Sequence, residues 1–289
     1  MPLTRSPYDR EILRLAVPAL GALAAEPVYV LVDTAIVGHL GVAPLAALAV
    51  AGTLLTGAFT LFNFLTYGTT AQVARFHGAG DEPTATLLGV QALWLAAGIG
   101  VVLLALAEAL ASPTVRLIGA TGHTAELAVL YMRIAAIGLP FALLALAGQG
   151  YLRGVGDLRT PLRIVIASNL ANVVLELVFV YGFGWGVAGS ALGTAIAQAG
   201  MGLAFVGAVG TWQRPMLERI RPLLRIGGEI FVRTSALYAS FVVASAVLAR
   251  IGTASLAAHQ IAFQLWTFLA LVLDSVAIAG QVIVGRTLG

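Results

Sequence analysis

Long apolar runs, separated by short polar connections, make up almost the whole chain. A bilayer core of about 30 Å is crossed by about 20 helical residues, and each run is long enough to do so. The runs are continuous and do not alternate, which favours helices over the strands of a barrel. They cover residues 12–38, 45–73, 84–111, 126–151, 161–183, 187–211, 228–250 and 255–285. The pattern therefore predicts an all-α polytopic membrane protein with eight transmembrane helices.

The composition agrees with this prediction and excludes several classes of protein. Of 289 residues, 60% are hydrophobic and 10% are charged, whereas about 25% are charged in a typical soluble domain. A soluble fold of this size cannot bury so much apolar surface, so soluble enzymes and nucleic-acid-binding proteins are excluded. The chain has no cysteine, phosphate-binding loop, nucleophile triad or metal-ligand spacing. We therefore expect a protein that is not an enzyme, needs no cofactor and binds no nucleic acid.

The basic residues are all arginine, and they are distributed unevenly over the connections. Twelve lie at the N-terminus, in the even-numbered connections or after the last run, whereas the odd-numbered connections hold only Arg116 and Arg250. Cytoplasmic loops of membrane proteins are enriched in arginine and lysine. The distribution predicts a cytoplasmic N-terminus, in a multi-pass protein of the bacterial inner membrane.

Two parts of the chain match one another at an offset of 211 residues, without a gap. Ile12-Leu13-Arg14-Leu15 lies over Leu223-Leu224-Arg225-Ile226, and Arg75 lies over Arg286. Both copies follow a cytoplasmic segment, so they have the same orientation in the membrane. We therefore infer a parallel repeat, with its axis along the membrane normal.

The repeat predicts how the chain is divided. A first lobe of six spans covers residues 1–211, a cytoplasmic inter-lobe loop covers 212–227, and 228–289 holds the first two spans of a second lobe. A complete second lobe would need about 130 further residues and four further spans. We therefore expect the sequence to be a fragment or a truncated form of a longer protein.

Three spans of the first lobe each place polar side chains on one face. Residues at i, i+3 and i+7, or at steps of four, share a helix face. Such a face is costly against lipid, so we expect the three faces to converge within the lobe. The residues are Glu26, Tyr29 and Asp33 in the first span, Asn169, Asn172 and Glu176 in the fifth, and Ser190, Thr194 and Gln198 in the sixth.

The two carboxyl groups most strongly indicate a function. Burial disfavours the charged form of a carboxyl group, so Asp33 and Glu176 could hold or release a proton near neutral pH. With Asn172 and Thr194, the same oxygens could instead bind sodium, because hard cations take oxygen ligands. The residue types do not decide whether a proton or a sodium ion binds there. Asn169 and Ser190 are more simply interpreted as interhelical hydrogen-bonding residues.

Other residues are candidates for a supporting role. Pro18 and Pro27 interrupt the first span, and a proline removes a helical hydrogen bond, so we predict a bend there. Asp274 in the eighth span maps onto Asn63 in the second span under the repeat, and both could line a central cavity. Asp33 maps onto Ala244, so the charged site is not duplicated in the second lobe.

The sequence resembles the multidrug and toxic compound extrusion (MATE) transporters over nearly its whole length. The resemblance lies in Tyr29-x-x-x-Asp33 after a proline, in the segment Val32 to Gly41, in Asn172-x-x-x-Glu176, and in Leu152-Arg153-Gly154-x-Gly156-Asp157-x-Arg159-Thr160-Pro161. The DinF-like branch of that family is the most similar, because its intramembrane carboxylates also lie in the first lobe.

This resemblance implies a MATE-like fold of two six-helix lobes and an activity. A proton or sodium ion enters while an amphipathic, often cationic, compound leaves, by alternating access of the two lobes. Asp33 matches the family's first-helix carboxylate, and the positions that complete its cation site are matched by Asn172, Glu176 and Thr194. Tyr29 matches an aromatic residue of the same pocket, and Pro18 matches the first-helix proline. Glu176 stands where relatives often have aspartate. This difference leaves open whether the coupling ion is a proton or a sodium ion.

Two alternatives remain. A lipid-linked oligosaccharide flippase of related architecture would carry a cluster of basic residues in its cavity. Apart from the arginines counted above with the connections, only Arg133 and Arg233 fall within spans, near their ends. A non-functional fragment of a transporter is the other alternative. For an exporter, we expect small amphipathic or cationic substrates and the bilayer as partners, and a monomer as the functional form.

Overall fold

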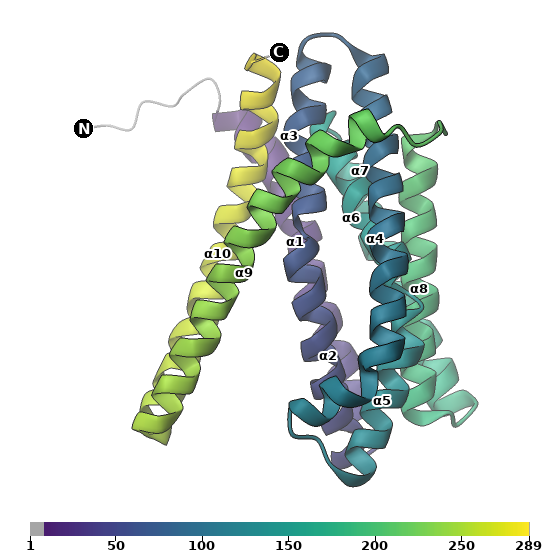
Figure 1. The fold of residues 1–289 in the computed structure, drawn as a ribbon, viewed down its shortest axis with the longest axis vertical. Helices are drawn as coiled ribbons and strands as arrows, with labels where there is room; N and C mark the ends of the chain where they lie inside the picture. The colour runs from purple at the N-terminus through teal and green to yellow at the C-terminus, as the bar shows by residue number, and fades with distance from the viewer. Residues whose placement is uncertain (1–8, 289) are drawn as a thin grey trace.

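The computed structural model describes residues 9–288, apart from the side chains of residues 245, 246, 249, 253–257 and 260. This described part consists of helices and short connections and contains no strand (Figure 1). Residues 1–8 and 289 lie outside the described part. They include Arg5, the predicted start of the first lobe and the predicted end of the second. The helices are α1 (Asp9–Gly38), α2 (Val42–Phe62), α3 (Phe64–Gly78), α4 (Glu82–Leu117), α5 (Gly122–Ala136), α6 (Leu139–Gly154), α7 (Arg159–Glu176), η1 (Leu177–Gly182), α8 (Gly186–Val209), α9 (Leu217–Ile251) and α10 (Thr253–Leu288).

The helices agree with the predicted number of membrane spans. Seven stretches of the described residues are long and apolar enough to cross a bilayer, and the bent pair α5 and α6 makes an eighth. That pair bends by 50° between Ala136 and Leu139. The bend has a local cause, because Pro140 at the start of α6 has no N–H to donate to the preceding turn. The run expected over 126–151 is therefore one broken span.

Two other predicted runs also contain an irregularity. The run 45–73 is divided at Asn63 into α2 and α3, and the run 161–183 ends in the π-helical turn η1 directly after Glu176. A π-helical turn inside an α-helix is uncommon and is frequently found at functional sites. Its position here places the distortion beside one of the two intramembrane carboxyl groups.

The inter-lobe loop is shorter than the sequence predicts. We expected a loop over 212–227, but α9 already begins at Leu217. Its first turns are amphipathic, because Leu223 is buried and Ile220 packs on the core while Arg221 and Arg225 are exposed. An apolar stripe at helical spacing stabilises a helix that lies against a core.

The core of the first six spans is built largely from small residues. Lipid chains are as apolar as leucine, so helices in a membrane gain most from close packing, which small side chains allow. One core cluster joins α2, α4, α5 and α8, and another joins α3, α4, α6 and α9. Fully buried alanines of the first cluster are Ala47, Ala51, Ala111, Ala128, Ala136 and Ala191.

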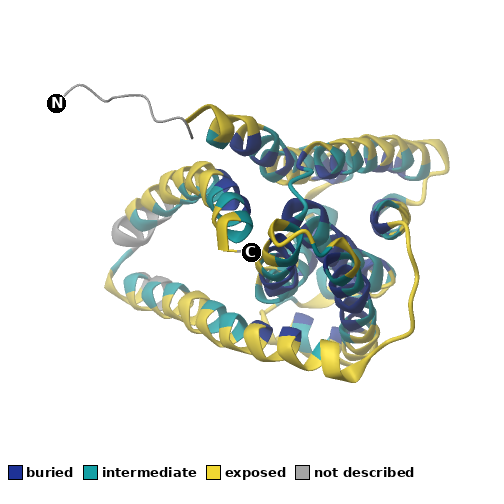
Figure 2. Ribbon diagram, turned by 90° about the horizontal axis from the view of Figure 1, so that it is seen from above, coloured by how far each residue is buried: buried dark blue, intermediate teal, exposed yellow. Residues whose placement is uncertain are grey.

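Helices α9 and α10 lie beside the six preceding spans and approach them at one end. Figure 1 shows both helices near α1 and α3 at the end that carries the C-terminus, and farther away at the opposite end. Much of their surface is exposed (Figure 2). The division into two lobes at residue 211 stays a prediction.

Candidate functional site

Four of the predicted polar residues lie together between α1, α7 and α8. Asp33 comes from α1, Asn172 and Glu176 come from α7, and Thr194 comes from α8. All four are buried, and Glu176 is completely inaccessible to solvent. The spacing of four residues between Asn172 and Glu176 puts both on the face of α7 that meets α8.

A hydrogen-bond network connects the carboxyl groups to α8. The Ser190 hydroxyl donates to Asp33 Oδ1 over 3.0 Å. The Thr194 hydroxyl lies 3.4 Å from Glu176 Oε1, to which it donates, and 3.1 Å from the phenolic oxygen of Tyr29. One turn of α8 therefore bridges the carboxyl group of α1 and that of α7.

Asn172 completes this network. With its amide nitrogen facing the carboxylate, the side chain donates to Glu176 Oε1 over 2.9 Å and accepts from the backbone N–H of Thr194 over 3.1 Å. This orientation matches each end of the amide with a complementary partner, which is how an asparagine amide is assigned. Two groups, the Thr194 hydroxyl and the Asn172 amide, thus contact the same oxygen of Glu176.

Within the described part of the chain, the carboxyl groups of this site have no basic partner. The carboxyl groups of Asp33 and Glu176 interact with one another. Among the described residues, no ion pair includes either group. Glu176 Oε2 is buried and has no hydrogen-bond partner there. The arrangement can therefore accept a proton or an oxygen-seeking cation, since two buried carboxylates in contact seldom both stay charged.

The close contact of α7 and α8 depends on Gly193, which has no side chain. A Cβ atom on Gly193 would lie 3.2 Å from Glu176 Cγ and 3.3 Å from the Glu176 backbone nitrogen. Glycine at this position lets α8 approach α7 closely enough for Thr194 to reach the carboxyl group. Small residues have this effect generally at helix contacts in membranes.

Three other predicted members of the polar faces lie outside this network. Glu26 is exposed on α1. The Asn169 amide donates to the Ala25 backbone oxygen over 3.1 Å, which is an interhelical hydrogen bond. Gln198 lies against Gly138 at the α5–α6 bend, and its Oε1 has no partner among the described residues. The polar faces converge in part, over about one turn of each helix.

Asn63 and Asp274 lie together at a different place. The Tyr67 hydroxyl donates to Asp274 Oδ2 over 2.7 Å and also interacts with Asn63. This contact joins α3 to α10, whereas the Asp33 network joins α1, α7 and α8. The structure makes Asn63 and Asp274 neighbours of one tyrosine, and their predicted place in a central cavity stays a prediction.

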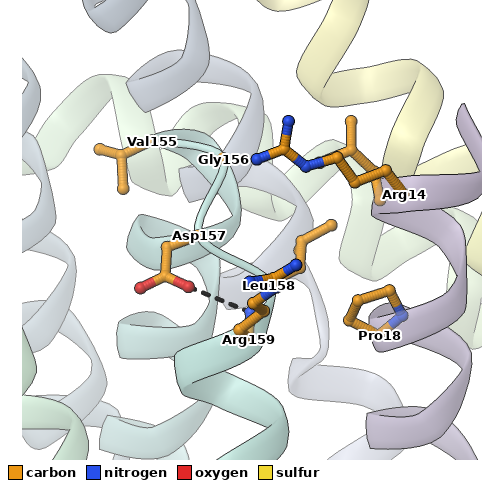
Figure 3. Close-up of a pocket in the computed structure, with 8 residues that line it drawn as sticks. Arg14, Pro18, Val155, Gly156, Asp157, Leu158 and Arg159 are labelled. Carbon is orange, nitrogen blue, oxygen red and sulfur yellow. Dashed lines mark hydrogen bonds between the residues drawn. The ribbon is translucent and has the colours of Figure 1, made fainter. Parts of the chain in front are cut away.

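The two prolines of the first span lie within one helix. α1 runs from Asp9 to Gly38 through both Pro18 and Pro27. Pro18 lines a cavity of about 280 Å³, together with Arg14 and the loop from Val155 to Arg159 (Figure 3). The Asp33 network is not part of this cavity. A role of either proline as a bend stays a prediction.

Sequence reasoning missed one member of the site and undervalued another. Tyr131 of α5 is 3% exposed and interacts with Asp33, Ser190 and Thr194. It lies in an otherwise apolar run, and its hydroxyl, which needs a partner when buried, was the available signal. Ser190 was interpreted as a structural hydrogen-bonding residue, but its partner is the Asp33 carboxyl group.

Comparison with known proteins places this geometry in a family. The MatE family model matches residues 18–178, more than half of the chain. The chain is 34% identical to Protein DETOXIFICATION 44, chloroplastic, of Arabidopsis thaliana, and 30% identical to DNA damage-inducible protein F of Escherichia coli K12. These alignments cover 96% and 97% of this chain, and 56% and 64% of the two relatives. The chain therefore spans less than two thirds of their length.

A solved structure confirms the fold. The chain superposes with a TM-score of 0.86, at 24% identity, on a structure described as the outward-facing conformation of a multidrug resistance MATE family transporter of the MOP superfamily. The match covers 96% of this chain and 65% of that one. The observed helices, the buried residues of α1, α7 and α8, and these matches lead to one conclusion: the chain belongs to the MatE family of multi-pass membrane transporters, and its relatives include DinF.

Proposed function

We propose that the protein is a secondary antiporter that exports small amphipathic or cationic compounds in exchange for a proton or a sodium ion. Asp33 and Glu176 are the coupling groups in this proposal, and Asn172 and Thr194 complete the cation site. The membership in a transporter family supports transport, and the chemistry of the site supports a cation as the coupling species. We place the protein in the bacterial inner membrane, with its N-terminus in the cytoplasm and as a monomer.

The observation that carries the proposal is a pair of buried carboxyl groups in contact, without an arginine partner among the residues that the structure describes. A structural role for such a pair is a poor choice, because an uncompensated buried charge is strongly destabilising. A proton shared between Asp33 and Glu176 would remove one of the charges. A sodium ion would be held by oxygens of Asp33, Glu176 and Thr194, with the Asn172 amide oxygen available on rotation.

The position of the site suggests how cation binding affects the rest of the protein. Asp33 and Tyr29 belong to α1, whereas Glu176 and Thr194 belong to the α7–α8 hairpin. A bound cation draws α1 towards the hairpin, and its release lets the two separate. α1 also packs against α10, so a shift of α1 reaches the helices that follow the first six spans. Coupling in this proposal is therefore a change in how α1 packs.

The first experiment is transport by the purified protein in liposomes. Efflux of a cationic dye is followed under an imposed pH gradient and, separately, under a sodium gradient. We expect Asp33→Asn and Glu176→Gln each to abolish coupled efflux, while the matched control Glu126→Gln, an exposed carboxyl group at the start of α5, retains it. Full activity of Asp33→Asn would overturn the proposed role of this residue.

A second measurement does not require transport. A ligand that binds only the folded protein raises the melting temperature by mass action. If sodium binds at the site, we expect sodium chloride, but not potassium chloride, to raise the melting temperature, and Asp33→Asn to abolish the difference. If a proton is the coupling ion, the two salts should act alike, and the pH gradient alone should drive efflux. Inactivity under both gradients, together with equal effects of both salts, would contradict the proposal.

A further inference from the structure

One face of α10 makes a layered contact with the first six spans. Asp274, Ile278, Val282 and Arg286 follow one another at steps of four residues, so they share one face of the helix. The described partners of these four residues lie on α1, on α3, on α6 and on the α6–α7 loop. This face therefore joins the second part of the chain to the first.

The outermost layer of this contact is formed by Arg286. Its Nη2 donates to the Val155 backbone oxygen over 3.3 Å, and its Nη1 lies 3.7 Å from Glu11 Oε1. The helix ends approach very closely at this level, because a Cβ atom on Gly78 would lie 2.5 Å from the Arg286 backbone oxygen. The ion pair is partly exposed, so we expect it to contribute little to holding the two helices together.

The middle layer is apolar and tightly packed. Ile278, Ala279 and Val282 of α10 are each 1% exposed or less, and they form one cluster with residues of α1 and the α6–α7 loop. The residues on the other side are Leu15, Ala16, Ala19 and Leu158. Water cannot reach these side chains unless α10 moves away from α1.

The innermost layer is polar. The Tyr67 hydroxyl of α3 donates to Asp274 Oδ2 over 2.7 Å. Arg153 of α6 is only 5% exposed, donates to Gln149 Oε1 over 3.0 Å, and interacts electrostatically with Tyr67 and Asp274. The sequence predicts that Arg153 lies in a connection between two spans, and only the structure shows that it is buried.

A buried arginine needs an opposite charge nearby. Within the described residues, the carboxylate that interacts with Arg153 belongs to Asp274, which is on the other side of the contact between α6 and α10. Removing the opposite charge from a buried charged group leaves that group uncompensated, which is destabilising. Asp274 is partly exposed, so separation of α10 from the first six spans would chiefly leave the buried Arg153 without its opposite charge until water reached it.

We propose that Tyr67, Asp274 and Arg153 form a latch, which holds this end of the protein closed by joining α10 to the first six spans. The latch deepens the proposed function and rests on it for its biological role, because alternating access requires this end to open. Tyr67 supplies the hydrogen bond, and Arg153 supplies the charge that keeps Asp274 in place. The apolar layer above the latch opens only when the latch does.

Thiol labelling tests the latch directly, since the chain has no cysteine. Ala279→Cys places a single thiol in the apolar layer, where residue 279 is 0% exposed. The purified protein in nanodiscs, where both faces meet the solution, is treated with a charged maleimide. The labelling rate then measures how often this end opens. Ala79→Cys in the exposed α3–α4 turn reports the intrinsic rate of the reagent.

The informative variants keep the size of the side chain. We expect Tyr67→Phe to raise the labelling rate at Ala279→Cys about tenfold, and Asp274→Asn to raise it at least as much. Because both changes break the same contact, the double variant should label no faster than the faster single variant. The matched control is Tyr151→Phe, whose hydroxyl contacts Thr86 over 3.3 Å within the first six spans. It should change the rate less than twofold.

Two results would overturn the proposal. Labelling of Tyr67→Phe and Asp274→Asn at the parent rate would show that the contact does not hold this end closed. An equal increase for Tyr67→Phe and Tyr151→Phe would show general loosening instead of a latch. If Asp274→Asn fails to fold, Tyr67→Phe with its control still decides the question. Labelling does not depend on transport, so inactive liposomes with a positive labelling result would contradict only the proposed function.

Discussion

At the scale of single residues, Thr194 connects the groups of the candidate site. Its hydroxyl lies 3.4 Å from Glu176 Oε1 and 3.1 Å from the Tyr29 hydroxyl, and it is buried. The sequence predicted Thr194 as a cation ligand from its place on a polar face. It did not predict that one hydroxyl would contact both the carboxyl group and the tyrosine, because those two residues lie on different helices.

Replacing this hydroxyl should destabilise the protein. Thr194→Val keeps the shape of the side chain but leaves Glu176 and Tyr29 without this partner, and an unsatisfied buried polar group costs about 1–3 kcal/mol. We expect the free energy of unfolding, measured by denaturant titration in detergent, to fall by that amount. Thr194→Ser retains the hydroxyl and should lose less than half as much. Equal losses in the two variants would indicate that packing, and not the hydrogen bonds, matters at this position.

At the scale of helices, close contacts depend on where glycine is placed. α8 carries Gly200 and Gly202 on different faces, and Gly202 lies against the backbone of Phe141 in α6. The sequence alone does not show which of the two glycines is needed for packing, since both lie in the same apolar run. Only the position of α6 shows which of them is required.

The two glycines therefore make opposite predictions. A Cβ atom on Gly202 would lie 2.4 Å from the Phe141 backbone oxygen, so Gly202→Ala must displace a helix and should destabilise by about 1–3 kcal/mol. A Cβ atom on Gly200 meets nothing within 4 Å. Gly200→Ala should stabilise by up to about 1 kcal/mol, because alanine favours a helix over glycine. Melting temperatures of the two variants should move in opposite directions, and a shift in the same direction would contradict this packing.

At the scale of the whole molecule, the linker between α8 and α9, residues 210–216, is held against the first six spans. Gln91 of α4 is completely buried, accepts from the Met216 backbone N–H over 2.6 Å and donates to the Arg214 backbone oxygen over 3.0 Å. Trp94 donates to the Gln213 backbone oxygen over 2.8 Å. We therefore expect the linker to move with the first six spans, so that a motion of the second part begins at α9.

Hydrogen exchange can test this attachment. Gln91→Leu removes the acceptor of the Met216 amide, which we expect to exchange about fivefold faster, because a hydrogen bond between neutral groups contributes about 1 kcal/mol. The same change on α3, Gln72→Leu, should leave exchange in the linker unaltered. Mass spectrometry of peptides that cover residues 210–217 provides the readout. Unchanged exchange in Gln91→Leu would show that Trp94 alone holds the linker.

The sequence by itself determined the membrane class, the helical spans and the polar faces of α1, α7 and α8. These are local properties, because hydrophobic length and helical spacing act within one segment. The tertiary structure decided which polar residues meet. It joined Asp33 to Ser190 and Glu176 to Thr194, left Glu26 exposed, and buried Arg153 opposite Asp274. It also added Tyr131 to the site. These contacts join residues far apart in the chain, and helix periodicity fixes a face but not the helix that the face will meet.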